Sequence, residues 1–421
     1  MEIPRLHQLL VCRPLLSDPI LRRLTDFFDR PEGEDAAYDF AAHLIQEAER
    51  WGLAGNLVAD YLLCRLVLNE NLVAGIMEQQ NGRIGKSLRA AFVHDITLLE
   101  PLLREKPSAY LPFELLDAYV PTGVRVADVQ EGAAALFAVM SQPWTAESLA
   151  DALLDHYQRY GSGDIAVYRA FRWDAEKKLV GIENFAPLRL SDLIGYMEQK
   201  QALLSNTLAF LSGRPANNVL LVGARGTGKS SSVKALANEF FRHGLRLVQL
   251  TKPQLAELPR IMRTLGRFAT KRFIVYLDDL SFEDNEPEYK ILKSGIEGGV
   301  EARPDNVLLY ATSNRRHIIK ENWRDREGAD DVHPGDSVNE TISLSDRFGL
   351  VIDYRSPTQK EYLAIIDHYL RAAGVLLSPE ELRLAGQRWE MEHSGRSGRT
   401  ARQFVDHYLG QRKAAEEASK S

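Results

Sequence analysis

The residues from Gly223 to Ser230 have the types and spacing of a phosphate-binding loop. They read Gly-Ala-Arg-Gly-Thr-Gly-Lys-Ser, which fits the pattern G-x-x-x-x-G-K-[ST], and they follow the apolar run "NVLLV". The three glycines let successive backbone N–H groups wrap a polyphosphate. The helix expected to open at Lys229 points the positive end of its dipole at the same anion. Lys229 then reaches the β- and γ-phosphates, and the Ser230 hydroxyl is expected to be a ligand of Mg²⁺.

Two neighbouring carboxylates end another strand-like run of the chain. The segment "RFIVYLDDLSFE" is apolar up to Asp278 and Asp279. Carboxylates at the carboxyl end of a parallel strand, beside a phosphate loop, can hold Mg²⁺ and orient an attacking water. We therefore expect Ser230 and Asp278 to form the metal site, with Asp279 next to it.

Further polar residues follow in a consistent order. The run "DNVLLYATSN" ends at Asn314, where a polar side chain can bond the γ-phosphate or the lytic water. Arg347 follows an acidic loop, and "SGRSGRTARQF" places Arg396, Arg399 and Arg402 at or near a helix start. Cations there oppose the helix dipole and so favour an anionic ligand. A single arginine is more often a solvated surface charge, but several such features in one order argue against coincidence.

An alternation of strands and helices must position these residues. The strand-like runs are "NVLLVG", "RLVQL", "RFIVYLDD" and "NVLLYATSN", with helical stretches after the first three. This order predicts an α/β fold with a parallel sheet and crossover helices. After Pro357 the chain reads as three helices.

The chain ahead of this core is expected to be mostly helical, because its apolar residues recur at helical spacing. A period of two in "DIAVYRAFRW", followed by "LVGI", predicts a hairpin. Its Arg169, Arg172 and Trp173 could stack on a base, although packing against a neighbour is the favoured interpretation. The predicted parts are a helical N-terminal domain at 1–160, a hairpin and linker at 161–186, an α/β core at 187–356, a helical lid at 357–412 and a disordered tail at 413–421.

Composition limits the classes of partner. The 421 residues carry a formal net charge of −6, so no global basic field attracts nucleic acid. Two cysteines, Cys12 and Cys64, favour a reducing compartment without a disulfide framework. No apolar stretch approaches the roughly 18 residues of a membrane span. We expect a cytoplasmic protein with no membrane partner.

Over about residues 183–412 these motifs resemble the AAA+ ATPase superfamily. "VGARGTGKS" is similar to its Walker A motif, "VYLDD" to Walker B, "YATSN" to sensor 1, "SDRFG" to the arginine-finger segment and "SGRTAR" to sensor 2. "DLIGYMEQK" looks like the segment that folds over adenine. The resemblance implies ATP and Mg²⁺ as cofactors and a catalytic set of Asp279, Glu283, Asn314 and Arg347. The nucleotide-binding residues that it implies are Ile194, Gly195, Gly223, Ala224, Arg225, Gly226, Thr227, Gly228, Lys229, Ser230, Ser231 and Arg399.

The resemblance is narrower to an uncharacterised bacterial family of single-module ATP-binding proteins, a domain of unknown function. One departure from the superfamily concerns the second Walker B acid, which is normally Glu and here is Asp279. Either Asp279 orients the water across a longer gap, or Glu283 supplies the carboxylate. That alternative stays open at the level of sequence.

Two main hypotheses of function follow. The first is an Mg-dependent ATPase that remodels or loads a macromolecular partner chosen by the N-terminal domain. It implies a homo-oligomer in which Arg347 completes the neighbouring subunit's site. The second is an ATP-dependent assembly switch that hydrolyses slowly or not at all. A small-molecule kinase is disfavoured, since it needs neither the lid nor the finger. A protein partner is expected, and nucleic acid stays open.

Overall fold

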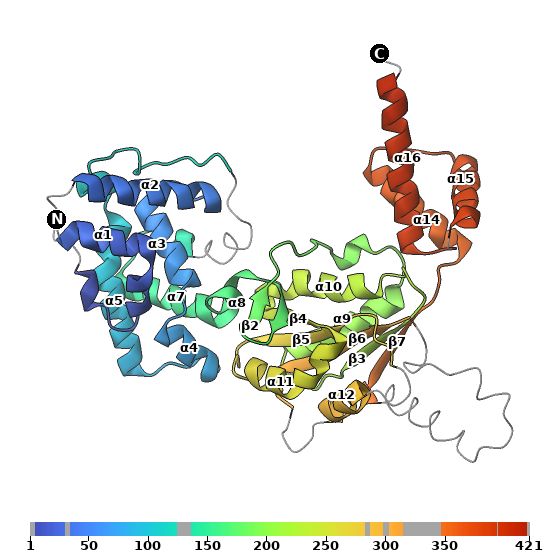
Figure 1. Ribbon diagram of the computed structural model, residues 1–421, viewed down its shortest axis with the longest axis horizontal. Coiled ribbons are helices and arrows are strands. Elements are labelled where there is room, and N and C mark those ends of the chain that lie inside the picture. Colours follow the sequence, from blue (N-terminus) through green and yellow to red (C-terminus); the bar gives the residue numbers. More distant parts are fainter. Residues whose placement is uncertain are drawn as a thin grey trace.

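The computed structural model describes residues 5–29, 34–123, 136–282, 287–297, 303–314, 347–393 and 395–418. Figure 1 shows three parts in chain order: a helical N-terminal domain, a sheet covered by helices, and a small group of helices at the C-terminal end. The sheet lies between the other two parts, so the N-terminal domain and the lid approach it from different sides.

The N-terminal domain is a helical bundle, as its periodicity predicts. Its main helices are α1 (Pro19–Asp29), α2 (Glu34–Trp51), α3 (Leu57–Leu68), α4 (Leu72–Gln79), α5 (Lys86–Arg104) and α7 (Ala146–Tyr160). The apolar α3 is buried along almost its whole length and lies inside the domain's single apolar core. The buried Asp95 carboxylate accepts the backbone N–H groups of Leu10, Val11 and Cys12, which fixes the start of the chain against α5.

The central sheet has the strand order β2-β1-β4-β5-β6-β3-β7 among the described residues. Only the β1–β2 pair is antiparallel, and the other described pairs are parallel. The strands are β1 (Ala170–Asp174), β2 (Lys178–Gly181), β3 (Val219–Gly223), β4 (Leu245–Leu250), β5 (Arg272–Leu277), β6 (Val307–Ser313) and β7 (Leu350–Tyr354). The α/β fold class with a parallel sheet is confirmed.

Helices cover both faces of this sheet, so its strands are buried on both sides. On one face pack α9 (Met197–Leu211) and α10 (Lys229–Phe240). On the other pack α11 (Leu258–Gly266) and α12 (Pro287–Glu297). The four strands expected from the apolar runs are β3 to β6. All of them are parallel, so their carboxyl ends meet at one edge, where the phosphate loop leaves β3 (Figure 1).

Two local expectations need correction, and one strand was not predicted. The alternating segment expected as one strand begins instead as the short helix α8 (Asp164–Val167), and only its second half forms β1. The β1–β2 hairpin exists, but β1 pairs with β4 and extends the sheet, so it is not a separate linker. The strand β7 was not expected, because "LVIDY" is too short and too close to the lid to stand out.

The C-terminal lid consists of the three expected helices, α14 (Gln359–Ala372), α15 (Pro379–Glu392) and α16 (Gly398–Ala418). The first two begin with capping boxes, in which Thr358 pairs with Glu361 and Ser378 with Glu381. These helices share a small apolar core of their own. Because α16 continues to Ala418, the stretch 413–418 is helical and not the disordered tail that its polar composition predicted.

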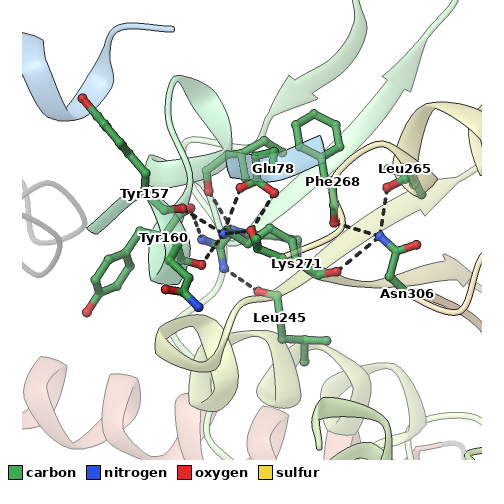
Figure 2. A network of polar contacts seen from close by, with 12 residues as sticks. Glu78, Tyr157, Tyr160, Leu245, Leu265, Phe268, Lys271 and Asn306 are labelled. Atoms are coloured by element: carbon green, nitrogen blue, oxygen red, sulfur yellow. Dashed lines mark hydrogen bonds and ion pairs between the residues drawn. The ribbon is translucent and has the colours of Figure 1, made fainter. Parts of the chain in front are cut away.

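Buried charges join the N-terminal domain to the sheet (Figure 2). They lie near the amino ends of β4 and β5, whereas the phosphate loop follows the carboxyl end of β3. Lys271, just before β5, is fully buried, and its Nζ lies 2.9 Å from Oε1 of Glu78 in α4. The same Nζ donates to the carbonyls of Tyr157 and Gln158 near the end of α7. Arg246 of β4, also fully buried, donates to the carbonyl of Tyr160. We call Glu78, Lys271 and Arg246 the junction network.

A candidate nucleotide-binding cleft

The phosphate loop leaves β3 at Gly223 and enters α10 at Lys229, as its motif predicts. Gly223, Gly226 and Gly228 all have positive φ, at 131°, 75° and 94°. A Cβ on Gly223 would lie 2.0 Å from the carbonyl oxygen of Tyr354, and one on Gly226 would lie 2.7 Å from Ser397 Oγ. Two of the glycines are therefore required by the close approach of β7 and of the lid as well as by the turn.

Lys229 is held by neutral acceptors. Its Nζ donates to the carbonyls of Gly223 (2.8 Å) and Ala224 (2.7 Å) and to Oδ1 of Asn314 (3.1 Å). Burial lowers the pKa of Lys229, and the nearby Asp279 and Asp278 carboxylates only partly offset this. The ammonium has lost much of its water and has gained no ion pair within the described residues. An anionic ligand that reaches it would meet a cation that is already desolvated and oriented.

Asp278 follows the last residue of β5 and accepts hydrogen bonds from hydroxyl groups on three elements. Its Oδ1 takes hydrogen bonds from Ser230 (2.7 Å), Tyr276 (2.7 Å) and Thr312 (2.8 Å). Burial alone would raise the pKa of Asp278, but these donors outweigh it and the pKa lies below its ordinary value. Ser230 and Asp278 together present hard oxygen donors, which fit Mg²⁺, an ion that keeps several waters and takes ligands from phosphates.

Asp279 has a left-handed backbone, with φ of 53°. Its N–H donates to Thr312 Oγ1 at 2.9 Å, and its Oδ1 accepts Nδ2 of Asn314. Asn314 therefore bridges the Lys229 ammonium and the Asp279 carboxylate. This is possible because Asn314 directly follows β6, which lies between β3 and β5 in the sheet.

The lid closes the cleft above the phosphate loop. The N–H of Arg399, in the first turn of α16, donates to the carbonyl oxygen of Gly226. One face of α14 contributes Ile365, His368 and Tyr369 to the cleft, and the guanidinium of Arg402 lies 5.0 Å from the centre of the Tyr369 ring. The sequence analysis did not predict these α14 residues as part of the site, although their i, i+3, i+4 spacing places them on one face of a helix.

The cleft has a volume of about 980 Å³ and collects most of the predicted site residues. Those in its wall are Ile194, Arg225, Gly226, Thr227, Gly228, Lys229, Ser230, Ser231, Asp278, Asp279, Asn314 and Arg399. Gly195 follows the wall residue Ile194 in the chain, and Gly223 and Ala224 are the first two residues of the phosphate loop. Glu283 lies outside the described residues.

The structure does not bring Arg347 into this cleft. Arg347 precedes β7, whose Leu350 pairs with Val219 at the start of β3. The phosphate loop begins at the other end of β3, at Gly223, about 13 Å away at roughly 3.3 Å per residue. Arg347 therefore lies toward the amino end of the strands, while the cleft lies at their carboxyl end.

A parallel sheet, a phosphate loop, an acidic pair, a polar residue just after the strand between them and a helical lid are the features by which the chain resembles the AAA+ ATPases. The family model described as "Protein of unknown function (DUF815)" matches residues 166–412, more than half of the chain. The chain belongs to this family.

More distant likenesses cover only parts of other proteins. The chain is 27% identical over 105 residues to the replication factor C large subunit of Methanococcus maripaludis, covering 24% of this chain and 21% of the relative. It is 28% identical over 151 residues to the same subunit of Methanococcus vannielii, covering 33% and 30%. The chain thus spans less than a third of the length of these curated relatives.

Among solved structures, the fold is similar to the Thermotoga maritima RuvB Holliday junction branch migration motor. The TM-score is 0.39 at 17% identity, over 55% of this chain and 67% of that one. For C. elegans PCH-2 the TM-score is 0.34 at 19% identity, over 51% and 63%. No helix of the described residues is long and apolar enough to cross a membrane.

Proposed function

We propose that the protein is an Mg-dependent ATPase that works as an oligomer and uses ATP hydrolysis to remodel or load a macromolecular partner. The observation that carries the proposal is the convergence of Lys229, the Ser230–Asp278 pair and the Asp279–Asn314 pair in one cleft. These side chains follow the ends of two strands, β5 and β6, or belong to the start of one helix, α10, and their chemistry suits a triphosphate and a water.

In this proposal each residue has a separate task. Lys229 binds the β- and γ-phosphates, and the backbone N–H groups of the loop and of the first turn of α10 bind the remaining oxygens. Ser230 and Asp278 would hold Mg²⁺, which supplies neutralisation of the charge on the phosphates. Asp279, held by Asn314, orients the attacking water, and Glu283 is the alternative for that task. Arg399 approaches the nucleotide from the lid.

Phosphate release tests the proposal, with Lys229→Ala as the inactive control. Wild-type protein should release phosphate from ATP only with Mg²⁺, and the control should not. Asp279→Asn and Glu283→Gln each remove one carboxylate and keep its shape. The variant that abolishes turnover but still binds ATP identifies the water-orienting acid. If neither substitution slows release, the proposed position of the water is wrong.

A slow or non-hydrolysing assembly switch is the second candidate. It is favoured by the short side chain of Asp279, which reaches one methylene less far than Glu, and by its bond to Asn314. Under this function ATP would bind and change the assembly state, but wild-type phosphate release would stay at the level of the Lys229→Ala control. Phosphate release measured against the Lys229→Ala control separates the two functions, and analytical ultracentrifugation with and without ATP tests the change of assembly state.

The place of Arg347 supports an arginine finger that acts on a neighbouring subunit. It lies away from its own chain's cleft, near the amino end of β7. Such a finger is worth roughly 10³–10⁵ in rate, so Arg347→Ala should nearly abolish turnover and leave ATP binding intact. Mixing Arg347→Ala with Lys229→Ala subunits should restore some activity, because the second donates an intact arginine to the first. If the mixed oligomers form and stay inactive while Arg347→Ala alone hydrolyses normally, the finger is refuted.

The partner itself is proposed only by class. The N-terminal domain has its own core and stands apart from the cleft, so it can contact a macromolecule without blocking the nucleotide. A protein is the expected partner. Capture with Asp279→Asn and Glu283→Gln combined, in the presence of ATP, would identify what the bound state holds.

A further inference from the structure

One hydroxyl group joins the two acidic residues of the cleft. Thr312 of β6 is buried, with 1% of its surface exposed. Its Oγ1 donates to Asp278 Oδ1 at 2.8 Å and accepts the N–H of Asp279 at 2.9 Å. Its carbonyl oxygen accepts the N–H of Leu280 at 2.7 Å. The turn that leaves β5 is thus bonded to a single residue of the neighbouring strand.

These bonds stabilise a turn that contains an unfavourable backbone conformation. A left-handed residue other than glycine is disfavoured, although Asp tolerates the conformation better than most residues. The N–H groups of Asp279 and Leu280 donate hydrogen bonds to Thr312, and these bonds stabilise that conformation. It is the left-handed residue that directs the Asp279 carboxylate toward Asn314.

The same hydroxyl also directs the Asp278 carboxylate. Three hydroxyls from Ser230, Tyr276 and Thr312 converge on Oδ1. Within the described part of the chain, Oδ2 accepts no hydrogen bond and stays available to a cation or a water. The carboxylate therefore presents one oxygen to the protein and the other to the cleft.

We propose that Thr312 is a positioning residue that ties the metal-holding carboxylate of Asp278 to the water-orienting carboxylate of Asp279. The proposal rests on the proposed ATPase function. Movement of β6 against β5 would displace both acids together, since one oxygen atom bonds to both residues.

The test compares four variants that each change one buried side chain of β5 or β6. Thr312→Val is nearly isosteric but removes both hydroxyl bonds, and Thr312→Ser keeps them. Tyr276→Phe removes another donor to Asp278 and leaves Asp279 untouched. Tyr310→Phe is the matched control, because it removes a buried hydroxyl from β6 that bonds only Thr207 and Asn206 among the described residues.

Two measurements are made on each full-length variant: phosphate release, and ATP affinity by calorimetry in EDTA and in Mg²⁺. Thr312→Val should lower turnover at least tenfold and reduce the gain in ATP affinity that Mg²⁺ gives, while affinity in EDTA stays within about threefold. Thr312→Ser should keep most of the turnover. Tyr276→Phe should reduce the Mg²⁺ effect but lower turnover less than Thr312→Val does. Tyr310→Phe should resemble wild type in both measurements.

Several results would overturn the inference. Turnover and Mg²⁺ effect unchanged in Thr312→Val would show that the bonds do not matter. Equal losses in Thr312→Val and Tyr276→Phe would show that the link to Asp279 adds nothing. Equal losses of turnover in Thr312→Ser and Thr312→Val would assign the effect to packing. If the valine variant does not fold, a loss of turnover in the serine variant would by itself assign the effect to packing, because serine keeps the hydroxyl group. Absence of turnover in wild type would instead refute the proposed function, and the Mg²⁺ effect on ATP binding would then decide the role of Thr312 at Asp278.

Discussion

Lys229 and Lys271 are both buried lysines of the same domain, but they stand at opposite ends of the parallel sheet. Lys229 follows the carboxyl end of β3, and Lys271 precedes the amino end of β5. Their exposed fractions are 5% and 0%. Each ammonium donates to two backbone carbonyls. Burial lowers the pKa of both, that of Lys271 to about 8.

Their remaining partners differ, and this difference separates a binding group from a structural one. Lys229 completes its bonds with a neutral amide, Asn314, at the wall of an open cleft. Lys271 completes them with the Glu78 carboxylate and the Thr270 hydroxyl, in a junction closed by two domains (Figure 2). A buried cation with neutral acceptors gains much from an arriving anion, whereas one already paired gains little.

The largest effect on stability is expected at the junction. Lys271→Met removes one partner of a buried ion pair and leaves Glu78 uncompensated, which typically costs about 3–5 kcal/mol. Denaturant unfolding followed by circular dichroism measures the loss. Lys290→Met, at an exposed site, is the control and should change stability by no more than about 0.5 kcal/mol. A loss at Lys271 as small as in the control would mean that the junction network does not hold the domains together.

The corresponding change at the other end of the sheet should act on ligand binding. Lys229→Ala removes a charge-assisted contact worth about 1.5–3 kcal/mol, so ATP affinity should fall at least roughly tenfold. Calorimetric titration with ATP measures this. Lys271→Met, titrated at a temperature where it is folded, should bind ATP as wild type does. If both variants lose affinity equally, the contrast between the two lysines fails.

A double substitution separates the ion pair from the space that it fills. Glu78→Gln combined with Lys271→Met leaves no buried charge without its partner, so the double variant should be about 1–2 kcal/mol more stable than Lys271→Met alone. Because the two residues are in contact, their separate effects should not add. Strict additivity in the unfolding cycle would show that the 2.9 Å contact between Glu78 and Lys271 carries no coupling.

The sequence predicted the cleft better than the junction, for a physical reason. The loop motif, the acidic pair and Asn314 depend on short segments whose strands have clear apolar patterns, so residues such as Lys229 and Asp278 could be placed in advance. Their mutual contacts required only that the strands be parallel. Glu78 and Lys271 belong to segments without a recognisable motif. They lie nearly 200 positions apart in the chain and come into contact only because the two domains pack against each other.

Other features were missed because tertiary contacts override local pattern. The strand β7 forms because it pairs with β3, and β1 extends the sheet because it pairs with β4. Trp173, which could have stacked on a base, instead donates its indole N–H to Glu257 and is 3% exposed. The proposed role of Thr312 could not be predicted, because it depends on the left-handed backbone of Asp279, and no pattern of residue types indicates that conformation.

The smallest expected effect is a dependence of the junction on pH. In the folded protein the pKa of Lys271 is about 8, and burial is the main cause, with Glu78 opposing it and Arg246 adding to it. In the unfolded chain a lysine pKa is about 10.4. Between these values the unfolded chain binds more protons, so the stability that Lys271 contributes is complete above about pH 10.4 and is lost as pH falls toward 8.

The measurable quantity is the difference in unfolding free energy between wild type and Lys271→Met. Taking the difference cancels most of the titration of the buried tyrosines and of Arg246, whose own pKa burial lowers to about 9. From pH 8.5 to 9.5 the difference should rise in favour of wild type by about 1 kcal/mol, close to the limit of one proton per pH unit. A flat difference would mean that Glu78 compensates the burial of Lys271 fully. The two buried lysines would then differ in how well they are compensated as well as in what they face, since within the described residues the Lys229 ammonium bonds to neutral acceptors and has no ion pair.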